Sequence, residues 1–311
     1  MNIALVDPSR AVQAAVTQLL APRGHRVSVF TDPCEALARI ASDQTLQAVI
    51  TSAELSPISG VEFCWEARLL AGDWRPLYIM LMTSHTDEQT MIECLDMGAD
   101  EVIGKPPSRR ELFARLRVAE RNIRLQTELI RLATTDPMTG LLNRRAFFEQ
   151  GTELCREAAQ GDLLAAILFD VDYFKEVNDL YGHQTGDETI RSIAAEARKG
   201  QSLAGRLGGD EICILLKRHS LARAWDVAED LRSRIANLRI RTPDGAAKVT
   251  SSLGVSEWKA GQNIDDLIRD ADLALYRAKR EGRDCVSTPP PVAWIADNPR
   301  HVSRVVRQRA R

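Results

Sequence analysis

Short apolar runs alternate with amphipathic stretches over residues 2–106, and this alternation restricts the fold more than any other feature of the chain. A chain that alternates strand and helix in this way forms a parallel sheet with helices on both faces, which is a doubly wound α/β domain. The predicted strands are Asn2–Val6, Arg26–Phe30, Ala48–Thr51, Leu77–Met82 and Glu101–Ile103, and the helices between them include Ala11–Leu20, Pro33–Ile40 and Asp87–Met97.

The composition is ordinary for a globular protein, and the length of 311 residues suggests two domains. Hydrophobic residues make up 44%, charged residues 27%, and the net charge is −2. This balance argues against a nucleic-acid coat and a polybasic membrane binder, and no apolar run is long enough to span a bilayer. The sequence begins without a secretory leader. The six scattered cysteines have no metal-binding spacing, so we expect reduced thiols in a cytoplasmic protein.

A long helical pattern rich in Arg, Glu and Leu connects the two halves over residues 108–135. Apolar residues recur in it at intervals of seven, which favours a parallel coiled-coil dimer. The alternative is a single amphipathic helix that lies on its own domain. The repeating positions form one series of Leu116, Ile123 and Ile130, an adjoining series of Leu112, Ala119, Gln126 and Ala133, and a third line of Val118, Leu125 and Leu132.

A second α/β pattern covers residues 136–286 and predicts a central mixed sheet. Beyond it, Pro289, Pro290 and Pro291 end regular structure. Residues 287–311 form a basic tail that we expect to be disordered, with binding of an anionic partner as the alternative. The predicted elements of the second domain are helices at 144–157, 187–198, 220–237 and 264–280, strands at 163–170 and 248–255, and a strand pair around Gly208.

Two acids, Asp170 and Asp172, follow the strongest apolar run of this domain. On a continuing strand this spacing puts both carboxylates on one face, where they repel each other unless a cation lies between them. Magnesium favours a few carboxylates together with phosphate oxygens. A solvated junction between strand and loop is the alternative.

Three further motifs carry polar groups suited to a nucleotide. The segment from Asn178 to Asp187 contains two glycines and amide and carboxylate groups that match the edge of a base, although a polar turn before a helix has the same composition. Two glycines between apolar runs predict a hairpin, with two adjacent acids directly after it: Gly208, Gly209, Asp210 and Glu211. Lys279 and Arg283 stand four apart at a helix end and suit a triphosphate.

These motifs, in this order and spacing, resemble the GGDEF family over roughly residues 134–285, as does the opening segment Asp136–Arg145. The resemblance implies a palm-like cyclase domain that condenses two GTP into cyclic di-GMP and releases pyrophosphate. It implies a homodimer, formed through the linker helix and the first domain, because each domain binds one GTP. It implies no nucleic-acid or membrane partner.

The resemblance also assigns roles to individual residues. Catalysis falls to Asp210, Glu211 and Lys175. Guanine is read by Asn178 and Asp187, with His183 close by. A divalent ion, Mg²⁺ or Mn²⁺, is held by Asp170, the carbonyl of Val171, Asp210 and Glu211. The phosphates are held by the main chain of Tyr173, Phe174 and Lys175, by Gly208 and Gly209, and by the side chains of Lys279 and Arg283.

Two departures from the family pattern bear on activity. Ile212 replaces the usual Phe of the signature, and we expect this apolar exchange to be tolerated. The inhibitory product site Arg-x-x-Asp corresponds here to Lys199–Ser202, which lacks the Arg fork and the carboxylate, so we expect little product feedback. The rival to an active enzyme is a catalytically silent nucleotide-binding module that signals through protein contacts. An adaptor driven by the first domain is a third, weaker alternative.

Residues 1–120 resemble a response-regulator receiver of the flavodoxin-like type. Asp7 follows the first strand, Thr83 ends the fourth, and Lys105 and Pro106 follow the fifth. The position of the phospho-accepting Asp holds Ser52 or Ala53, and the second acid beside Asp7 is Pro8. We therefore expect a degenerate receiver that binds magnesium poorly and accepts no aspartyl phosphate. Substitution by Glu54 is the alternative.

Overall fold

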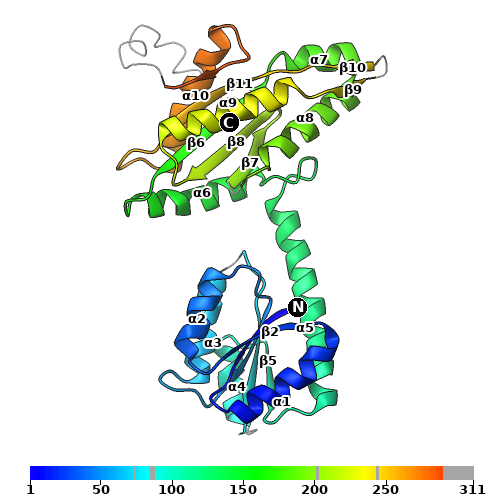
Figure 1. Cartoon of the computed structure of the whole chain (residues 1–311), viewed down its shortest axis with the longest axis vertical. Coiled ribbons are helices and arrows are strands. Elements are labelled where there is room, and N and C mark those ends of the chain that lie inside the picture. The colour runs from blue at the N-terminus through cyan, green and yellow to red at the C-terminus, as the bar shows by residue number, and fades with distance from the viewer. Residues whose placement is uncertain (73, 85–87, 201–202, 243–244, 290–311) are drawn as a thin grey trace. The chain divides into compact units, whose positions relative to one another are not determined.

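The computed structural model describes residues 1–72, 74–84, 88–200, 203–242 and 245–289. The basic tail predicted for residues 287–311 therefore lies almost wholly outside the described residues. The chain divides into two compact units, Met1–Arg131 and Leu132–Arg311, and each is described here by itself (Figure 1).

The N-terminal unit contains a five-stranded parallel sheet in the order β2-β1-β3-β4-β5. This order confirms the predicted doubly wound fold, and each predicted strand is present to within a residue or two. The elements are β1 (Asn2–Val6), α1 (Arg10–Leu20), the 3₁₀ turn Ala21–Arg23, β2 (Arg26–Phe30), α2 (Pro33–Ser42), β3 (Ala48–Ser52), α3 (Gly60–Ala71), β4 (Tyr78–Thr83), α4 (Glu88–Asp96), β5 (Glu101–Gly104) and α5 (Arg109–Thr134).

The sheet has one hydrophobic cluster on each face because its central strands are buried on both sides. One cluster packs α2, α3 and α4 against the sheet, and the other packs α1 and the first half of α5. Parallel strands covered on both faces read as continuous apolar runs, which is why the sequence predicts this unit so closely.

The packing of α5 corrects the predicted coiled-coil seam. Leu112, Leu116, Ala119 and Ile123 are buried in the core of the N-terminal unit, so the first halves of two predicted series face their own domain. The exposed apolar residues of the helix are Leu125, Leu129 and Leu132, at 53%, 65% and 62% relative exposure. Two of these three belong to the third apolar line of the sequence.

The C-terminal unit is built on a five-stranded mixed sheet in the order β12-β11-β6-β8-β7. Only β11 and β12 run parallel, and the other neighbours are antiparallel. The elements are α6 (Arg144–Ala158), β6 (Leu164–Val171), α7 (Phe174–Tyr181), α8 (His183–Ala197), β7 (Leu203–Gly208), β8 (Glu211–Lys217), α9 (Leu221–Ala236), β9 (Ile240–Thr242), β10 (Gly245–Ala247), β11 (Ser251–Glu257), α10 (Ile264–Arg280) and β12 (Val286–Ser287).

Helices cover both faces of this sheet. In Figure 1, α9 crosses the face toward the viewer, and α8 and α9 share one hydrophobic cluster with the sheet, while α6 and α10 share the other. The contact between α10 and β11 is very close, since a Cβ on Gly254 would lie 2.1 Å from the carbonyl oxygen of Ala271. Glycine at this position therefore fixes α10, and the end of α10 reaches the candidate site.

Candidate active site

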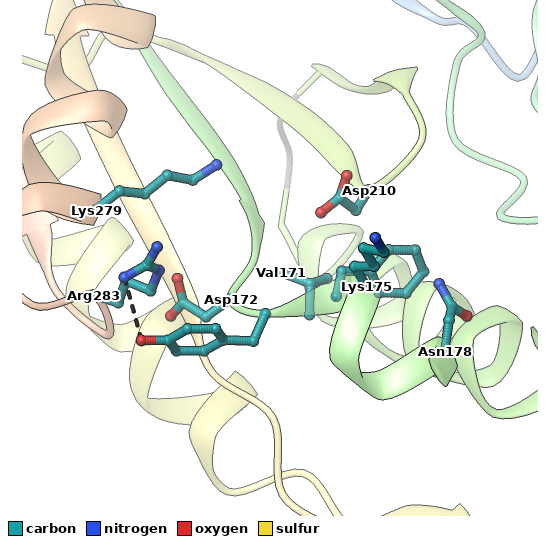
Figure 2. A pocket seen from close by; sticks show the side chains of 9 residues that line it. Val171, Asp172, Lys175, Asn178, Asp210, Lys279 and Arg283 are labelled. Atoms are coloured by element: carbon teal, nitrogen blue, oxygen red, sulfur yellow. Dashed lines mark hydrogen bonds between the residues drawn. The ribbon is translucent and has the colours of Figure 1, made fainter. Parts of the chain in front are cut away.

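A cavity of about 410 Å³ opens where β6 ends, between α7, the β7–β8 turn and the end of α10 (Figure 2). Strand ends in α/β sheets commonly carry ligand sites. Its walls bring together eight residues predicted from the sequence, with one neighbour of theirs. They are Val171, Asp172, Tyr173, Phe174, Lys175, Asn178, Asp210, Lys279 and Arg283.

Asp170 lies beside this cavity at the end of β6, with only 7% of its side chain exposed. Its Oδ2 accepts a hydrogen bond from Lys279 Nζ, whereas its buried Oδ1 has no hydrogen-bond partner among the described residues. Burial raises the pKa of Asp170 to about 6, the charge on Lys279 opposes this shift, and the nearby Asp210 adds to it. A buried carboxylate oxygen without a donor is a group that a cation would satisfy.

The β7–β8 hairpin holds the second acid. Gly209 and Asp210 form the turn itself, and Glu211 begins β8 opposite Gly208, so Asp210 lies in the turn and not after it. A Cβ on Gly209 would meet nothing within 4 Å. No contact with the described part of the chain demands glycine there, so those residues leave the space beside the turn open to a ligand.

Hydrogen bonds from the Arg206 side chain, which the sequence did not indicate, hold this hairpin in place. Arg206 donates from Nε and Nη2 to the carbonyl oxygen of Gly209, at 3.0 and 2.7 Å, and from Nη1 to both carboxylate oxygens of Asp136, at 3.2 Å. Asp136 in turn accepts hydrogen bonds from the N–H and hydroxyl of Thr139. The opening motif of the domain therefore holds the turn that carries Asp210.

Asp172 lies close enough to Asp170 for its charge to raise the pKa of Asp170, but its own carboxylate has other partners. β6 ends at Val171, and Asp172 in the following turn accepts hydrogen bonds from the hydroxyl of Thr250, just before β11, and from that of Ser252 within β11. The described residues contain no group of three or more His, Cys, Asp or Glu side chains placed to hold one metal. The Asp172 oxygens already accept hydrogen bonds from protein donors, so the structure gives no support to a cation shared between Asp170 and Asp172.

The segment predicted as a loop between Asn178 and Asp187 consists of two helix ends. Asn178 lies in the last turn of α7, and His183 and Asp187 lie in the first turns of α8. A Cβ on Gly186 would approach Asn178 Oδ1 to 1.9 Å, so glycine lets this side chain lie against α8. The predicted guanine-reading residues thus lie on two adjoining helices.

Positive charge enters the cavity from two sides. The first turn of α7 presents backbone N–H groups that lack partners within the helix, and Lys175 lies in this turn. Figure 2 shows Lys279 and Arg283 on the other side of the cavity from Asn178. The sequence suggested that Arg283 lies on the face of this helix together with Lys279. In the structure α10 ends at Arg280, so Arg283 lies in the turn after the helix.

The site fits a divalent ion of the magnesium type. Asp170 Oδ1 offers a buried free oxygen, Asp210 carries a second carboxylate close enough to influence its pKa, and Val171 lines the same cavity. Few protein ligands together with phosphate oxygens and water match the way proteins hold Mg²⁺. Glu211 is not among the cavity-lining residues, and its metal contact stays a prediction.

In the N-terminal unit, Glu54 bonds to the residue that stands at the predicted phospho-acceptor position. Lys105 Nζ lies 2.9 Å from the buried Asp7 Oδ2 and donates to Ser52 Oγ at 2.8 Å, so Ser52 holds the place of the acceptor. Glu54 Oε2 accepts from Ser52 Oγ at 2.9 Å, and Oε1 accepts from the N–H of Ser84 at 3.0 Å. Burial opposes ionisation of Glu54, but these hydrogen bonds and Lys105 hold its pKa below the usual value.

We predict that this site takes up no phosphate. Its remaining acid, Asp7, is paired with Lys105, and Glu54 is engaged by Ser52 and Ser84. The test is incubation with a small phosphodonor followed by intact-mass measurement, with a phosphorylatable receiver as the positive control. A stable added phosphate on this chain would contradict the prediction.

None of the helices within the described ranges combines the length and hydrophobicity needed to cross a bilayer.

Comparison with known proteins identifies both units. Residues 133–285 match the family described as diguanylate cyclase, GGDEF domain, and residues 3–117 match the response regulator receiver domain. Response regulator PleD of Caulobacter vibrioides is 31% identical over 84% of this chain and 60% of its own length. Diguanylate cyclase DgcM of Escherichia coli is 42% identical over 52% of this chain and 40% of its own. The chain thus spans less than two thirds of either relative.

A solved structure gives the same result for the C-terminal unit. The coiled coil and GGDEF domain of DgcB from Caulobacter crescentus, in complex with c-di-GMP, is 32% identical, with a TM-score of 0.51. The match covers 57% of this chain and 98% of that one. The chain therefore belongs to the GGDEF family of diguanylate cyclases and carries a response-regulator receiver domain ahead of its GGDEF domain.

Proposed function

We propose that the chain is a diguanylate cyclase that condenses two GTP into cyclic di-GMP and pyrophosphate as a metal-dependent homodimer. The observation that carries the proposal is the partnerless buried oxygen of Asp170 beside a cavity lined by Lys175, Lys279 and Arg283. A triphosphate with a bound metal ion suits both sides of this cavity, because the metal pairs with the Asp170 carboxylate and the phosphates pair with the lysine and arginine side chains. The family to which the chain belongs supports the same reaction.

The residues around the cavity divide the work. Asn178 and Asp187 bind the guanine edge through their amide and carboxylate groups, with His183 beside the nucleotide. The N–H groups at the start of α7, Gly208 and Gly209 receive the phosphates, and Lys175, Lys279 and Arg283 offset their charge. Asp170, the Val171 carbonyl and Asp210 hold Mg²⁺ or Mn²⁺, with Glu211 beside them.

The 3′-hydroxyl of each GTP attacks the α-phosphate of the other, so that two phosphodiester bonds form and two pyrophosphates leave. A bound divalent ion lowers the pKa of the hydroxyl and offsets charge on the leaving group. Glu211, at the start of β8, completes the acidic cluster or takes the proton of the hydroxyl. Lys279, which bonds Asp170 in the structure, lines the same cavity and would offset the charge of the triphosphate there.

The two-substrate reaction requires two GGDEF domains that face each other, and we propose that α5 pairs them. Leu125, Leu129 and Leu132 are exposed and follow the spacing of four and three residues that defines a heptad seam. The same spacing continues backward through Asn122 to Val118. A polar Asn at such a position favours one register and a two-stranded assembly.

Leu129→Lys should separate the dimer and lower the cyclase activity at least tenfold, because a charge in the seam opposes helix pairing. Sedimentation velocity and activity over a range of protein concentrations measure both effects. Gln126→Lys, at an exposed position beside the seam, is the matched control. A monomeric Leu129→Lys variant with full activity would contradict the role of α5.

Product feedback at Lys199–Ser202 should be absent or weak. Lys199 pairs with Glu196 at 2.6 Å, and a lysine lacks the planar fork that binds an anion in two places. Titration of the protein with cyclic di-GMP measures this affinity. Tight binding that disappears in Lys199→Ala would refute the expectation.

The catalytically silent module remains the competing function, and Ile212 was its best support in the sequence. Ile212 is fully buried in the hydrophobic cluster of the sheet and is not among the residues that line the cavity. The direct test is incubation of the purified chain with GTP and Mg²⁺ and chromatography of the products. The proposal predicts cyclic di-GMP and pyrophosphate, whereas a silent module leaves GTP unchanged.

A further inference from the structure

Asp172 is a buried acid next to the candidate metal site, yet its carboxylate is already saturated with donors. The residue is 5% exposed. Oδ1 accepts from the Ser252 hydroxyl at 2.6 Å, and Oδ2 accepts from the Thr250 hydroxyl at 2.7 Å and from the backbone N–H of Asp284 at 3.0 Å. A buried carboxylate needs such donors, and here they come from the start of β11, from the residue just before it, and from the turn after α10.

The turn that receives this contact has an unfavourable backbone. Gly282, Arg283 and Asp284 have φ angles of 113°, 64° and 45°. Left-handed conformations at residues other than glycine are unfavourable and persist only when the surroundings enforce them. The hydrogen bond from the Asp284 N–H to Asp172 is one such contact, and it fixes the residue directly after Arg283.

The same turn sets the direction of the Arg283 side chain. Its guanidinium lies 4.4 Å from the centre of the Tyr173 ring, and Nη1 donates to the Tyr173 hydroxyl at 3.3 Å (Figure 2). Tyr173 directly follows Asp172 and also has a positive φ, 55°. Asp172 therefore bonds the backbone of the turn at Asp284, and Tyr173 contacts the guanidinium of Arg283.

We infer that Asp172 is a positioning residue for substrate binding: its carboxylate holds the turn after α10 so that Arg283 faces the triphosphate in the cavity. The inference rests on the proposed function, because it takes Arg283 as a cation for the nucleotide phosphates. A positioning role and a metal-ligand role require different properties of the Asp172 side chain. A positioning role needs hydrogen-bond acceptors of the right shape, whereas a metal ligand needs negative charge.

Two substitutions separate these roles. Asp172→Asn keeps the shape, and its Oδ1 can accept from the Thr250 hydroxyl and the Asp284 N–H. Its amide can then donate to the Ser252 hydroxyl, which rotates to accept. Asp172→Ala removes all three contacts. If Asp172→Ala does not fold, Asp172→Ser replaces it, since a serine hydroxyl is too short to reach the Asp284 N–H.

The experiment measures affinities for 3′-deoxy-GTP and 3′-deoxy-GMP by calorimetry in Mg²⁺, with thermal unfolding as the folding check. The variants are Asp172→Asn, Asp172→Ala, Arg283→Ala and the Asp172→Ala/Arg283→Ala double variant, and Asp230→Ala on the exposed face of α9 is the control for loss of an acid. We expect Asp172→Ala to weaken triphosphate binding about tenfold and monophosphate binding less than twofold. Asp172→Asn should stay within threefold of the wild type. The double variant should bind no more weakly than Arg283→Ala.

Three results would overturn the inference alone, provided that the wild type prefers the triphosphate. They are full triphosphate preference in Asp172→Ala, loss of metal-dependent binding in Asp172→Asn, and additive losses in the double variant. A wild type without any preference for the triphosphate would overturn the proposed function and this inference with it.

Discussion

Asp210→Ala should reduce cyclase activity at least about 1000-fold while the protein stays folded. Asp210 lies in the β7–β8 turn, on the cavity wall and near Asp170, where it has no part in the hydrophobic core. Loss of one charged metal contact removes several kcal/mol of transition-state stabilisation, and each factor of ten in rate corresponds to about 1.4 kcal/mol. Product formation from GTP and thermal unfolding measure the two effects.

The matched control is again Asp230→Ala, because Asp230 is an exposed acid that does not line the cavity, with 66% of its side chain accessible. It should keep the wild-type rate. If Asp210→Ala retains more than a tenth of the wild-type activity, the hairpin acid is not required for the reaction.

Asp170→Asn should have opposite effects on stability and activity. Burial raises the pKa of Asp170 to about 6, so the folded chain binds a proton there more tightly than the unfolded chain does. The ionised carboxylate therefore destabilises the metal-free protein above pH 6, and this penalty fades as the pH falls from 6 toward 4. A rise from 3.8 to about 6 corresponds to about 3 kcal/mol at most. The amide carries no charge and avoids this penalty.

We therefore expect metal-free Asp170→Asn to exceed the wild type by about 1–3 kcal/mol in unfolding free energy at pH 8, with the difference gone near pH 4. Its cyclase activity should be lost. Urea unfolding in EDTA at the two pH values gives the stability, and Asp230→Asn controls for removal of an exposed acid. A variant that is less stable than the wild type at pH 8 would show that Lys279 stabilises the carboxylate more than burial destabilises it.

The sequence predicted the regular parts of the molecule well because their physics is local. The parallel strands of the N-terminal unit are continuous apolar runs, and the glycine hairpin and α10 have clear turn and helix patterns. The sequence could not show which face of α5 is free to pair with a second helix, because Leu116 and Ile123 have the same spacing whether they face a second helix or their own sheet. Only the burial of these side chains separates the two cases.

The sequence indicated which residues line the cavity but not which hydrogen bonds and ion pairs hold them in place. Motif spacing identified the cavity-lining residues, but it could not show that the Asp172 carboxylate already accepts hydrogen bonds from other parts of the chain. The donors to Asp172 come from residues 78 to 112 positions away, and Arg206 reaches Asp136 across 70 positions. Such pairs depend on tertiary folding, and no local pattern in this sequence marks them.

The central claim is that Asp170 and Asp210 together bind a divalent ion against the nucleotide triphosphate. The most direct measurement is the affinity for 3′-deoxy-GTP, which has no attacking hydroxyl, in Mg²⁺ and in EDTA, for the wild type and Asp170→Asn. We predict binding at least tenfold tighter in Mg²⁺ for the wild type, and equal affinities in both buffers for Asp170→Asn. Wild-type binding that does not depend on the metal would contradict the account.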